Sequence, residues 1–133
     1  MWSRMARDLL LDTSVIVYYL RGDPAARRVL ASAGRVFVPS IAMGELFYGA
    51  ERSNQRVSKL AEAESLAAGN NVLDCDLETA RRYGEIQHQL RRKGRPIPDN
   101  DIWIAAIAQQ HELTVATRDG HFREIEDLDL LTW

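Results

Sequence analysis

Four acidic residues stand where an ordinary solvated surface acid is not expected. Asp12 directly follows the apolar run at residues 9–11, and Asp119 closely follows the run LTVAT at residues 113–117. On a helix, Glu45 and Asp101 would have no basic residue three or four positions away, so no local ion pair could compensate them. Two carboxylates about 4 Å apart repel by roughly 1 kcal/mol in water and roughly 4 kcal/mol at an intermediate dielectric. If the four converge at one edge of a sheet, protons or a cation must neutralise them, and all-oxygen ligands favour Mg²⁺ or Mn²⁺ over zinc.

Each of these acids also has an ordinary structural explanation. Asp12, before a Thr-Ser pair, is typical of a helix cap or turn, and Asp119, before a glycine, is typical of a turn. Asp99 has the position of a helix N-cap, and Asp101 would gain roughly 0.3 to 1 kcal/mol from the helix dipole. Glu45 could pair with a distant arginine. A shared site is favoured because one account then explains all four carboxylates.

The elements that must position these acids follow from the hydrophobic pattern, which alternates short apolar runs with helical segments. The expected strands are residues 9–11, 35–39, 72–73, 113–117 and 128–131. The expected helices run from a cap at residue 13 or 14 to about residue 20, over residues 25–32, 41–52, 55–68 and 77–93, and from a cap at residue 99 to residue 110, with a short helix after residue 120. The expected N-caps are Thr13 or Ser14, Asp23, Ser40, Asp76 and Asp99, and Gly94 is expected to follow a helix C-terminus. This order predicts an α/β fold with a central parallel sheet flanked by helices on both sides, whose functional groups gather at the carboxyl ends of the strands.

The expected helix that begins near Asp99 combines a buried body with an acidic first turn. From Ile102 to Ala108 it is apolar on every side, as in a fully buried helix, yet Asp99 and Asp101 stand at its start. A helix fixed by the core holds a ligand more accurately than a loop does. We therefore expect Asp101 to face the metal from the mouth of this helix.

Length, composition and charge limit the other possibilities. The 133 residues predict a single domain over residues 1–133, with residues 1–6 as a flexible N-terminal extension and either Met1 or Met5 as the natural start. The net charge of −2 argues against a protein that coats polyanions. The single cysteine, Cys75, fits a reducing cytoplasm, and a polar start and the lack of an 18-residue apolar run predict no secretion signal and no membrane span. The three histidines form no zinc pattern and are expected at the surface.

Four stretches in this order and spacing resemble PIN-domain ribonucleases, and among them the VapC-type toxins of bacterial toxin–antitoxin pairs. They are LLLDTSVIVYYL, GELFYGAER, NDIWIAAIA and TVATRD, within a resemblance that runs from Leu9 to Trp133. The resemblance implies a three-layer α/β/α fold with an acidic pocket at one edge of the sheet. It also implies cleavage of RNA that depends on Mg²⁺, for which Mn²⁺ may substitute.

The same resemblance assigns roles by position. Asp12, Glu45 and Asp101 match the three central acids of the family, and Asp119 matches a fourth, more variable one. Thr13 and Thr117 match hydroxyl positions that support the pocket, and Asp99, without a firm counterpart, is assigned to the same support. The carboxylates would hold the metal, and a metal-activated water would attack the phosphate in line, expel the 3′ oxygen and leave a 5′ phosphate. Asp119 or Asp101 would orient that water.

A basic cluster precedes the acidic helix and could hold RNA phosphates. It consists of Arg91, Arg92, Lys93 and Arg95. The alternative is that these residues are solvated and interact with the dipole at a helix C-terminus.

The resemblance also implies two protein partners. One is a small antitoxin whose C-terminal segment lies over the pocket and inserts a basic side chain near the acids, and the other is a second copy of the chain in a homodimer. Apolar residues that could serve these contacts, or simply the core, are Val15, Tyr18, Tyr19, Phe47 and Tyr48.

Other functions remain open alternatives. Within the same fold they are an RNA-processing PIN nuclease that is not a toxin, and an inactive PIN-like scaffold that binds RNA or protein. A haloacid-dehalogenase-like phosphatase would need a second acid where Ser14 stands. A phosphoacceptor receiver domain would need a lysine after its last strands, and Lys59 and Lys93, the only lysines, do not lie there.

Overall fold

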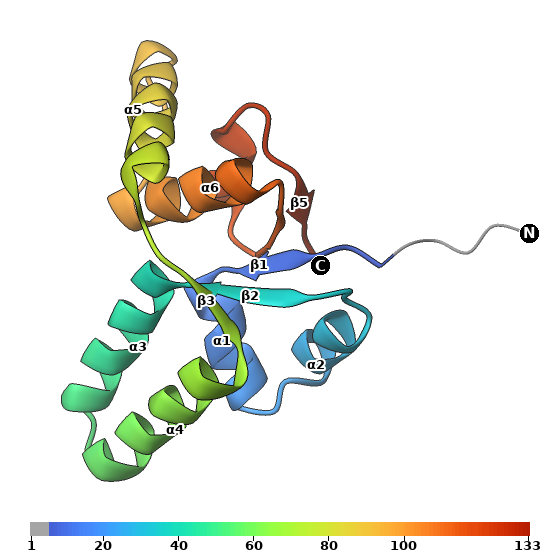
Figure 1. The fold of residues 1–133 in the computed structure, drawn as a ribbon, viewed down its shortest axis with the longest axis vertical. Helices are drawn as coiled ribbons and strands as arrows, with labels where there is room; N and C mark the ends of the chain where they lie inside the picture. The colour runs from blue at the N-terminus through green and yellow to red at the C-terminus, as the bar shows by residue number, and fades with distance from the viewer. Residues whose placement is uncertain (1–5) are drawn as a thin grey trace, which may run out of the picture.

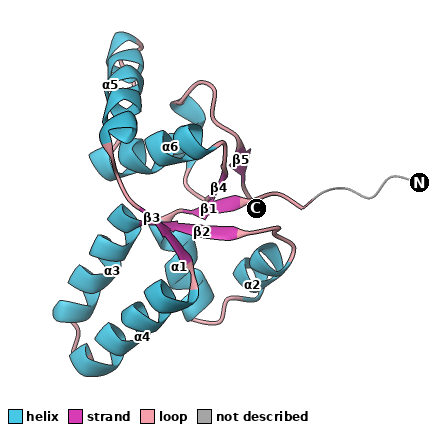
Figure 2. Cartoon of the chain, viewed as in Figure 1, coloured by secondary structure: helices cyan, strands magenta, loops and turns pink. Residues whose placement is uncertain are grey.

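Five parallel strands form the sheet in a computed structural model that describes residues 6–133. They are β1 (Leu9–Leu11), β2 (Val36–Pro39), β3 (Asn71–Leu73), β4 (Thr114–Ala116) and β5 (Leu130–Leu131), in the order β3-β2-β1-β4-β5 (Figures 1 and 2). The strand β1 therefore lies at the centre, between β2 and β4. The expected N-terminal extension and the choice between Met1 and Met5 lie outside the described residues, except for Ala6.

Helices cover both faces of this sheet in the described part of the chain (Figure 1). They are α1 (Thr13–Leu20), α2 (Pro24–Ala31), α3 (Ser40–Glu51), α4 (Arg56–Gly69), α5 (Leu77–Arg92), α6 (Asp99–His111) and the short 3₁₀ helix η1 (Gly120–Glu124). The first four lie on one side of the sheet, and α5, α6 and η1 lie on the other (Figure 1). The predicted α/β class, with helices on both sides of a parallel sheet, is confirmed.

The central strand explains why its sequence is apolar at every position. Successive side chains of a strand point to opposite faces. Leu10 packs with α5 and α6, whereas Leu9 and Leu11 pack with α1, α3 and α4. All three leucines are buried because both faces of β1 are covered. The strand is thereby fixed on both sides, and so is the backbone of the acid that follows it.

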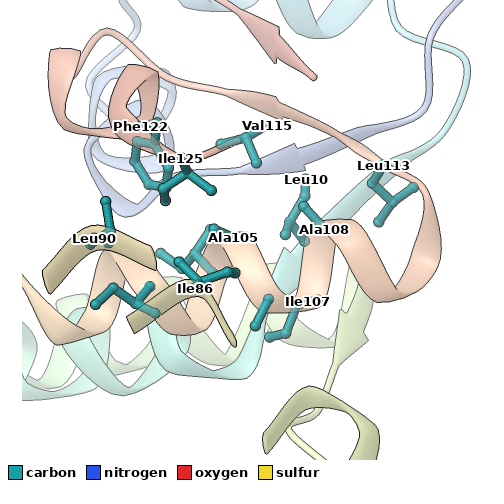
Figure 3. Packing of buried hydrophobic residues seen from close by; sticks show 13 residues of the cluster. Leu10, Ile86, Leu90, Ala105, Ile107, Ala108, Leu113, Val115, Phe122 and Ile125 are labelled. Atoms are coloured by element: carbon teal, nitrogen blue, oxygen red, sulfur yellow. The ribbon is translucent and has the colours of Figure 1, made fainter. Parts of the chain in front are cut away.

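The helix α6 is the buried helix that the sequence predicted. Ile102 and the whole segment from Ile104 to Ala108 are buried, as the apolar pattern requires. Figure 3 shows Ala105 and Ala108 of α6 among side chains from β1, β4 and α5, where the small methyl groups allow close packing. The core therefore holds α6 from several directions, and its acidic first turn lies at the end of a rigid element.

At three helices the N-cap is not the residue that was predicted. The N-caps are Asp12, Pro39 and Pro98, so Thr13, Ser40 and Asp99 are the first helical residues instead of caps. At two of these starts the side chain forms a hydrogen bond with another element of the fold instead of with the backbone of its own helix. The Thr13 hydroxyl donates to Glu45, and the Asp99 carboxylate accepts from α5.

Other local predictions are confirmed. Asp23 caps α2, and Asp76 caps α5 in a reciprocal capping box with Thr79. Gly94 follows α5 with a φ of 66°, the left-handed conformation that glycine adopts without strain. Within the described residues, no helix is both long and apolar enough to cross a bilayer.

Candidate active site

The acidic residues meet at the carboxyl edge of the sheet. Asp12 follows β1 and Asp119 follows β4, and these two strands are hydrogen-bonded neighbours. Glu45 approaches from α3, and Asp101 approaches from the first turn of α6. An open hollow of about 500 Å³ at this edge is lined by Asp12, Thr13, Ser14, Glu45, Pro98, Asp99, Asn100 and Asp101, and Asp119 is not among its lining residues. This lining contains four acids and no lysine or arginine.

Asp12 lies at the buried base of the pocket, where it is 6% exposed. Its Oδ2 accepts hydrogen bonds from the Thr117 hydroxyl at 2.8 Å and the Ser14 hydroxyl at 3.1 Å. The Thr117 hydroxyl oxygen also accepts from the backbone N–H of Asp119 at 2.9 Å. The buried Thr117 thus forms hydrogen bonds with the Asp12 carboxylate and with the backbone of Asp119. Burial raises the pKa of Asp12, although the hydrogen bonds from Thr117 and Ser14 oppose that rise.

Asp101 and Asp119 share one imidazole. The Nδ1 atom of His121 lies 3.3 Å from Oδ2 of Asp101 and 3.1 Å from Oδ1 of Asp119. Burial is the main cause that raises the pKa of Asp101 to about 6, and the negative charge of Asp12 raises it further. Asp12 and Asp101 line the same hollow, so two negative charges there would repel one another.

Glu45 lies at the rim of the pocket, and the sequence argument about it was wrong in one respect. The residue is exposed instead of lying on a buried apolar face, and no arginine pairs with it in the part of the chain that the structure describes. Its Oε1 accepts from the Thr13 hydroxyl at 3.0 Å and from the Asn100 amide at 3.2 Å. These bonds turn the carboxylate from α3 toward α1 and α6, so the residue still belongs to the same site.

The remaining predicted residues lie around the pocket or outside it. Asp99 lines the pocket, but its Oδ1 accepts from the Tyr83 hydroxyl at 3.1 Å and the Gln87 amide at 3.2 Å, which joins the start of α6 to α5. None of the basic cluster Arg91, Arg92, Lys93 and Arg95 lines the pocket. Lys93 donates to the backbone carbonyl of Glu124 at 2.7 Å, and Arg95 lies 4.0 Å from the Glu124 carboxylate. This part of the cluster therefore contacts the end of η1.

Sequence reasoning missed two residues of this site. Asn100, between the two acids of α6, donates to Glu45, and His121 contacts two carboxylates although it is half-exposed, as a surface histidine would be. The available signal was proximity in sequence, because each residue stands within two positions of a predicted acid. Which acid a neighbouring side chain meets depends on tertiary contacts, and those were not visible.

The donor set of the pocket fits a divalent cation. One oxygen each of Asp101 and Asp119 and one ring nitrogen of His121 lie within 4.8 Å of one another. Asp12 is linked to the same place through Thr117. Several carboxylates without a basic partner in the lining of the pocket are an arrangement that a divalent cation would neutralise.

The raised pKa of Asp101 predicts how stability depends on pH. Between pH 4 and 6 the folded protein keeps a proton on Asp101 that the unfolded chain has released, because the pKa is about 6 when folded and 3.8 when unfolded. The free energy of unfolding of metal-free protein should therefore fall by about 2 kcal/mol as the pH rises through this window. Urea unfolding in a chelator at pH 4.5 to 7.5 measures it.

The control is Asp101→Asn, in which that part of the slope should vanish. Asp8 and Asp76, whose pKa values are lowered by hydrogen bonds from Arg35 and Thr79, contribute an opposite slope only below about pH 4. An equal fall in unfolding free energy in both proteins would contradict the assignment to Asp101.

Comparisons with known proteins find relatives over most of the chain. The family model of the PIN domain matches residues 9–128. Ribonuclease VapC2 of Haemophilus influenzae and the tRNA(fMet)-specific endonuclease VapC of Shigella flexneri are each 33% identical over 119 residues, which cover 88% of this chain and 89% of theirs.

Among solved structures, VapBC2 of Rickettsia felis bound to a DNA fragment from its promoter has a TM-score of 0.86 at 25% identity, covering 95% of this chain and 98% of that one. DNA-bound VapBC of Salmonella typhimurium has a TM-score of 0.86 at 31% identity, covering 97% and 99%.

Proposed function

The chain belongs to the PIN domain family, and we propose that it is an endoribonuclease of the VapC type whose acidic pocket hydrolyses RNA with a bound divalent cation. The observation that carries this proposal is the convergence of acids from four separate elements. Thr117 links Asp12 with Asp119, His121 links Asp119 with Asp101, and Asn100 places Glu45 beside them. Carboxylates from such distant positions are costly to bring together unless a cation neutralises them.

The proposed roles follow from the position of each side chain. Asp12 and Asp101 in the pocket, with Asp119 beside Asp101, would hold the cation, and Glu45 would lie at the rim where the substrate enters. Bound Mg²⁺, or Mn²⁺ in its place, would lower the pKa of a coordinated water and polarise the scissile phosphate. Ser14 and Thr117 keep Asp12 in place by hydrogen bonds, and Asp119 or Asp101 would accept a hydrogen bond from the attacking water. Release of the 3′ oxygen would leave a 5′ phosphate on the product.

We also propose two protein partners, an antitoxin and a second copy of the chain. The solved VapBC structures are complexes, and this chain has a groove of about 280 Å³ that begins at the pocket residues Thr13 and Glu45 and continues between α1, α3 and α4. We infer that an antitoxin segment lies along this groove and brings a basic side chain to the acids. Of the apolar residues considered for partner contacts, Val15 is buried in the core, whereas Tyr48 on α3 is 65% exposed and could serve a homodimer. We place the protein in the cytoplasm as one domain, in keeping with its single cysteine.

A cleavage assay with a chelator control tests the activity. Incubation of the purified protein with total cellular RNA and Mg²⁺ should produce defined fragments with 5′-phosphate ends, which sequencing of the ends detects. Excess chelator should lower the rate at least about 100-fold, because the carboxylates then lose the ion that activates water, and added Mg²⁺ or Mn²⁺ should restore it.

Two outcomes would contradict the proposal. Cleavage that resists the chelator would remove the metal from the mechanism, and RNA binding without cleavage at saturating metal would favour the inactive scaffold. A separate expression test addresses the toxin role: growth should stop when the chain is produced and should recover when the product of the neighbouring reading frame is produced with it. Cleavage without growth arrest would favour an RNA-processing enzyme that is not a toxin.

A further inference from the structure

We propose that His121 is a nitrogen ligand of the divalent cation and makes the pocket bind Mn²⁺ more tightly than Mg²⁺. This inference rests on the proposed function, since it refines the same metal site. It assigns a direct role to a residue that is not acidic and that the sequence placed at the surface. The substrate reaction is unchanged, and the new content is the identity of a ligand and its effect on metal choice.

The fold fixes the position of His121 beside the acids. Asp119 caps η1, and the backbone N–H of His121 donates to Asp119 Oδ1 at 2.9 Å. The next residue, Phe122, is completely buried in the core that α5 and α6 share. The backbone of His121 is thus fixed by Asp119 on one side and by a buried aromatic ring on the other. Figure 3 shows this anchor, with Phe122 beside Ile125 and above α6.

The ring of His121 faces the place where the cation would bind. Its Nδ1 lies 3.1 Å from the Asp119 carboxylate and 3.3 Å from the Asp101 carboxylate. Adjacent ligands of an octahedral ion lie about 3 Å apart when each metal–ligand distance is about 2.1 Å. The nitrogen therefore already lies at nearly the spacing of an adjacent ligand from each of the two oxygens, and the three atoms lie within 4.8 Å of one another. The ring is half-exposed, so it can adjust by a small rotation about its side-chain bonds.

An ordinary hydrogen bond between a histidine and an acid does not account for the arrangement as fully. His121 contacts two carboxylates with the same nitrogen, so a single proton on that nitrogen would have to be divided between two acceptors. The other two histidines, His88 and His111, form no ion pair with an acid in the part of the chain that the structure describes. The contact is therefore specific to the acidic pocket and is not a general property of histidines in this chain.

Ligand chemistry then predicts the metal preference. Carboxylate oxygens suit Mg²⁺ and Mn²⁺, whereas an imidazole nitrogen suits transition-metal ions and is a poor ligand for Mg²⁺. A pocket with several oxygens and one such nitrogen should bind both ions and bind Mn²⁺ more tightly. Removal of the ring should weaken Mn²⁺ binding at least about tenfold and weaken Mg²⁺ binding less, so that the preference shrinks.

Electron spin-echo envelope modulation of bound Mn²⁺ tests the ligand directly. The protein loaded with Mn²⁺ should show modulation from a coordinated ¹⁴N nucleus, and growth on ¹⁵N-histidine should replace it with the ¹⁵N pattern. His121→Ala should lose this modulation, and the control His111→Ala should keep it. Calorimetric titration of His121→Asn, which offers an oxygen near the position of Nδ1, should show retained Mg²⁺ binding with a reduced preference for Mn²⁺.

The outcomes separate the two proposals. If Mn²⁺ binds, is lost in Asp101→Asn and shows no histidine nitrogen, the ligand role of His121 is overturned while the acidic metal site stands. If the modulation persists in His121→Ala, another histidine is the ligand and the inference is likewise wrong. If the folded wild-type protein binds no Mn²⁺ and no Mg²⁺, the metal site of the proposed function fails as well.

Discussion

Asp12→Asn is expected to lower the rate of RNA cleavage at least about 100-fold while the protein remains folded. Asp12 is the most deeply buried of the four acids, and its carboxylate is positioned by the Thr117 and Ser14 hydroxyls. An asparagine oxygen can still accept both hydrogen bonds, but its amide group turns a donor instead of a ligand toward the pocket. Loss of one metal ligand removes several kcal/mol of transition-state stabilisation, and each 1.4 kcal/mol is about tenfold in rate.

Single-turnover cleavage and thermal unfolding of the variant measure both parts of this expectation. The matched control is Asp74→Asn, because Asp74 also follows a strand of the sheet, β3, but is exposed and does not line the pocket. The control should cleave RNA at the wild-type rate. Full activity in Asp12→Asn would remove the pocket from the mechanism, and unfolding of the variant would assign Asp12 a structural role instead.

The comparison of these two acids shows what the sequence could predict. The rule that function gathers at the carboxyl ends of strands applies to Asp12, Asp74 and Asp119 alike. The rule alone does not distinguish a central strand from an edge strand, and β3 lies at the edge of the sheet, two strands away from β1. The apolar run of β1 did carry that information, since only a strand covered on both faces is apolar at every position.

The features of the site that could not be predicted depend on contacts between side chains that are distant in sequence. Glu45 lines the pocket, but the reason given for choosing it was wrong, because it is exposed at the rim and accepts hydrogen bonds from Thr13 and Asn100. Thr13 and Asp99 were considered both as caps of their own helices and as supports of the pocket, and each forms a hydrogen bond with a distant partner instead of capping its helix. Local propensity predicts the contacts that a side chain makes with its own helix or turn. At this pocket, side chains from several elements offer competing partners.

The acidic first turn of α6 lowers the stability of the folded protein at a site that we assign to function. Asp101 lies at the positive end of a helix dipole, which favours its charge, yet burial and Asp12 raise its pKa to about 6. At neutral pH the charged Asp101 therefore destabilises the metal-free protein. The burial of the apolar residues in the rest of α6 compensates for this cost. Such a cost is common at functional sites, where neighbouring groups are selected for chemistry instead of for stability.

Phe122→Ala is expected to be the most destabilising single change that bears on the site. Phe122 is completely buried among residues of α5 and α6, and it is among the largest fully buried side chains of the described residues (Figure 3). Truncation of a buried phenylalanine to alanine costs about 3 to 5 kcal/mol, a large part of the 5 to 15 kcal/mol that stabilises a typical domain. Urea unfolding in a chelator measures this loss, and Val57→Ala, at a residue that is 80% exposed, should change the unfolding free energy by less than about 0.5 kcal/mol.

The milder variant Phe122→Leu separates the packing role from the positioning role of the same ring. Leucine fills most of the space, so the chain should stay folded with a loss of about 1 kcal/mol. Because Phe122 anchors the segment that carries Asp119 and His121, the smaller side chain should still loosen both groups and weaken Mn²⁺ binding more than the change in stability alone requires. Unchanged Mn²⁺ affinity in a folded Phe122→Leu protein would show that the cap by Asp119 is sufficient to hold η1. A loss of stability below about 1 kcal/mol in Phe122→Ala would show that the core around α6 closes over the missing ring.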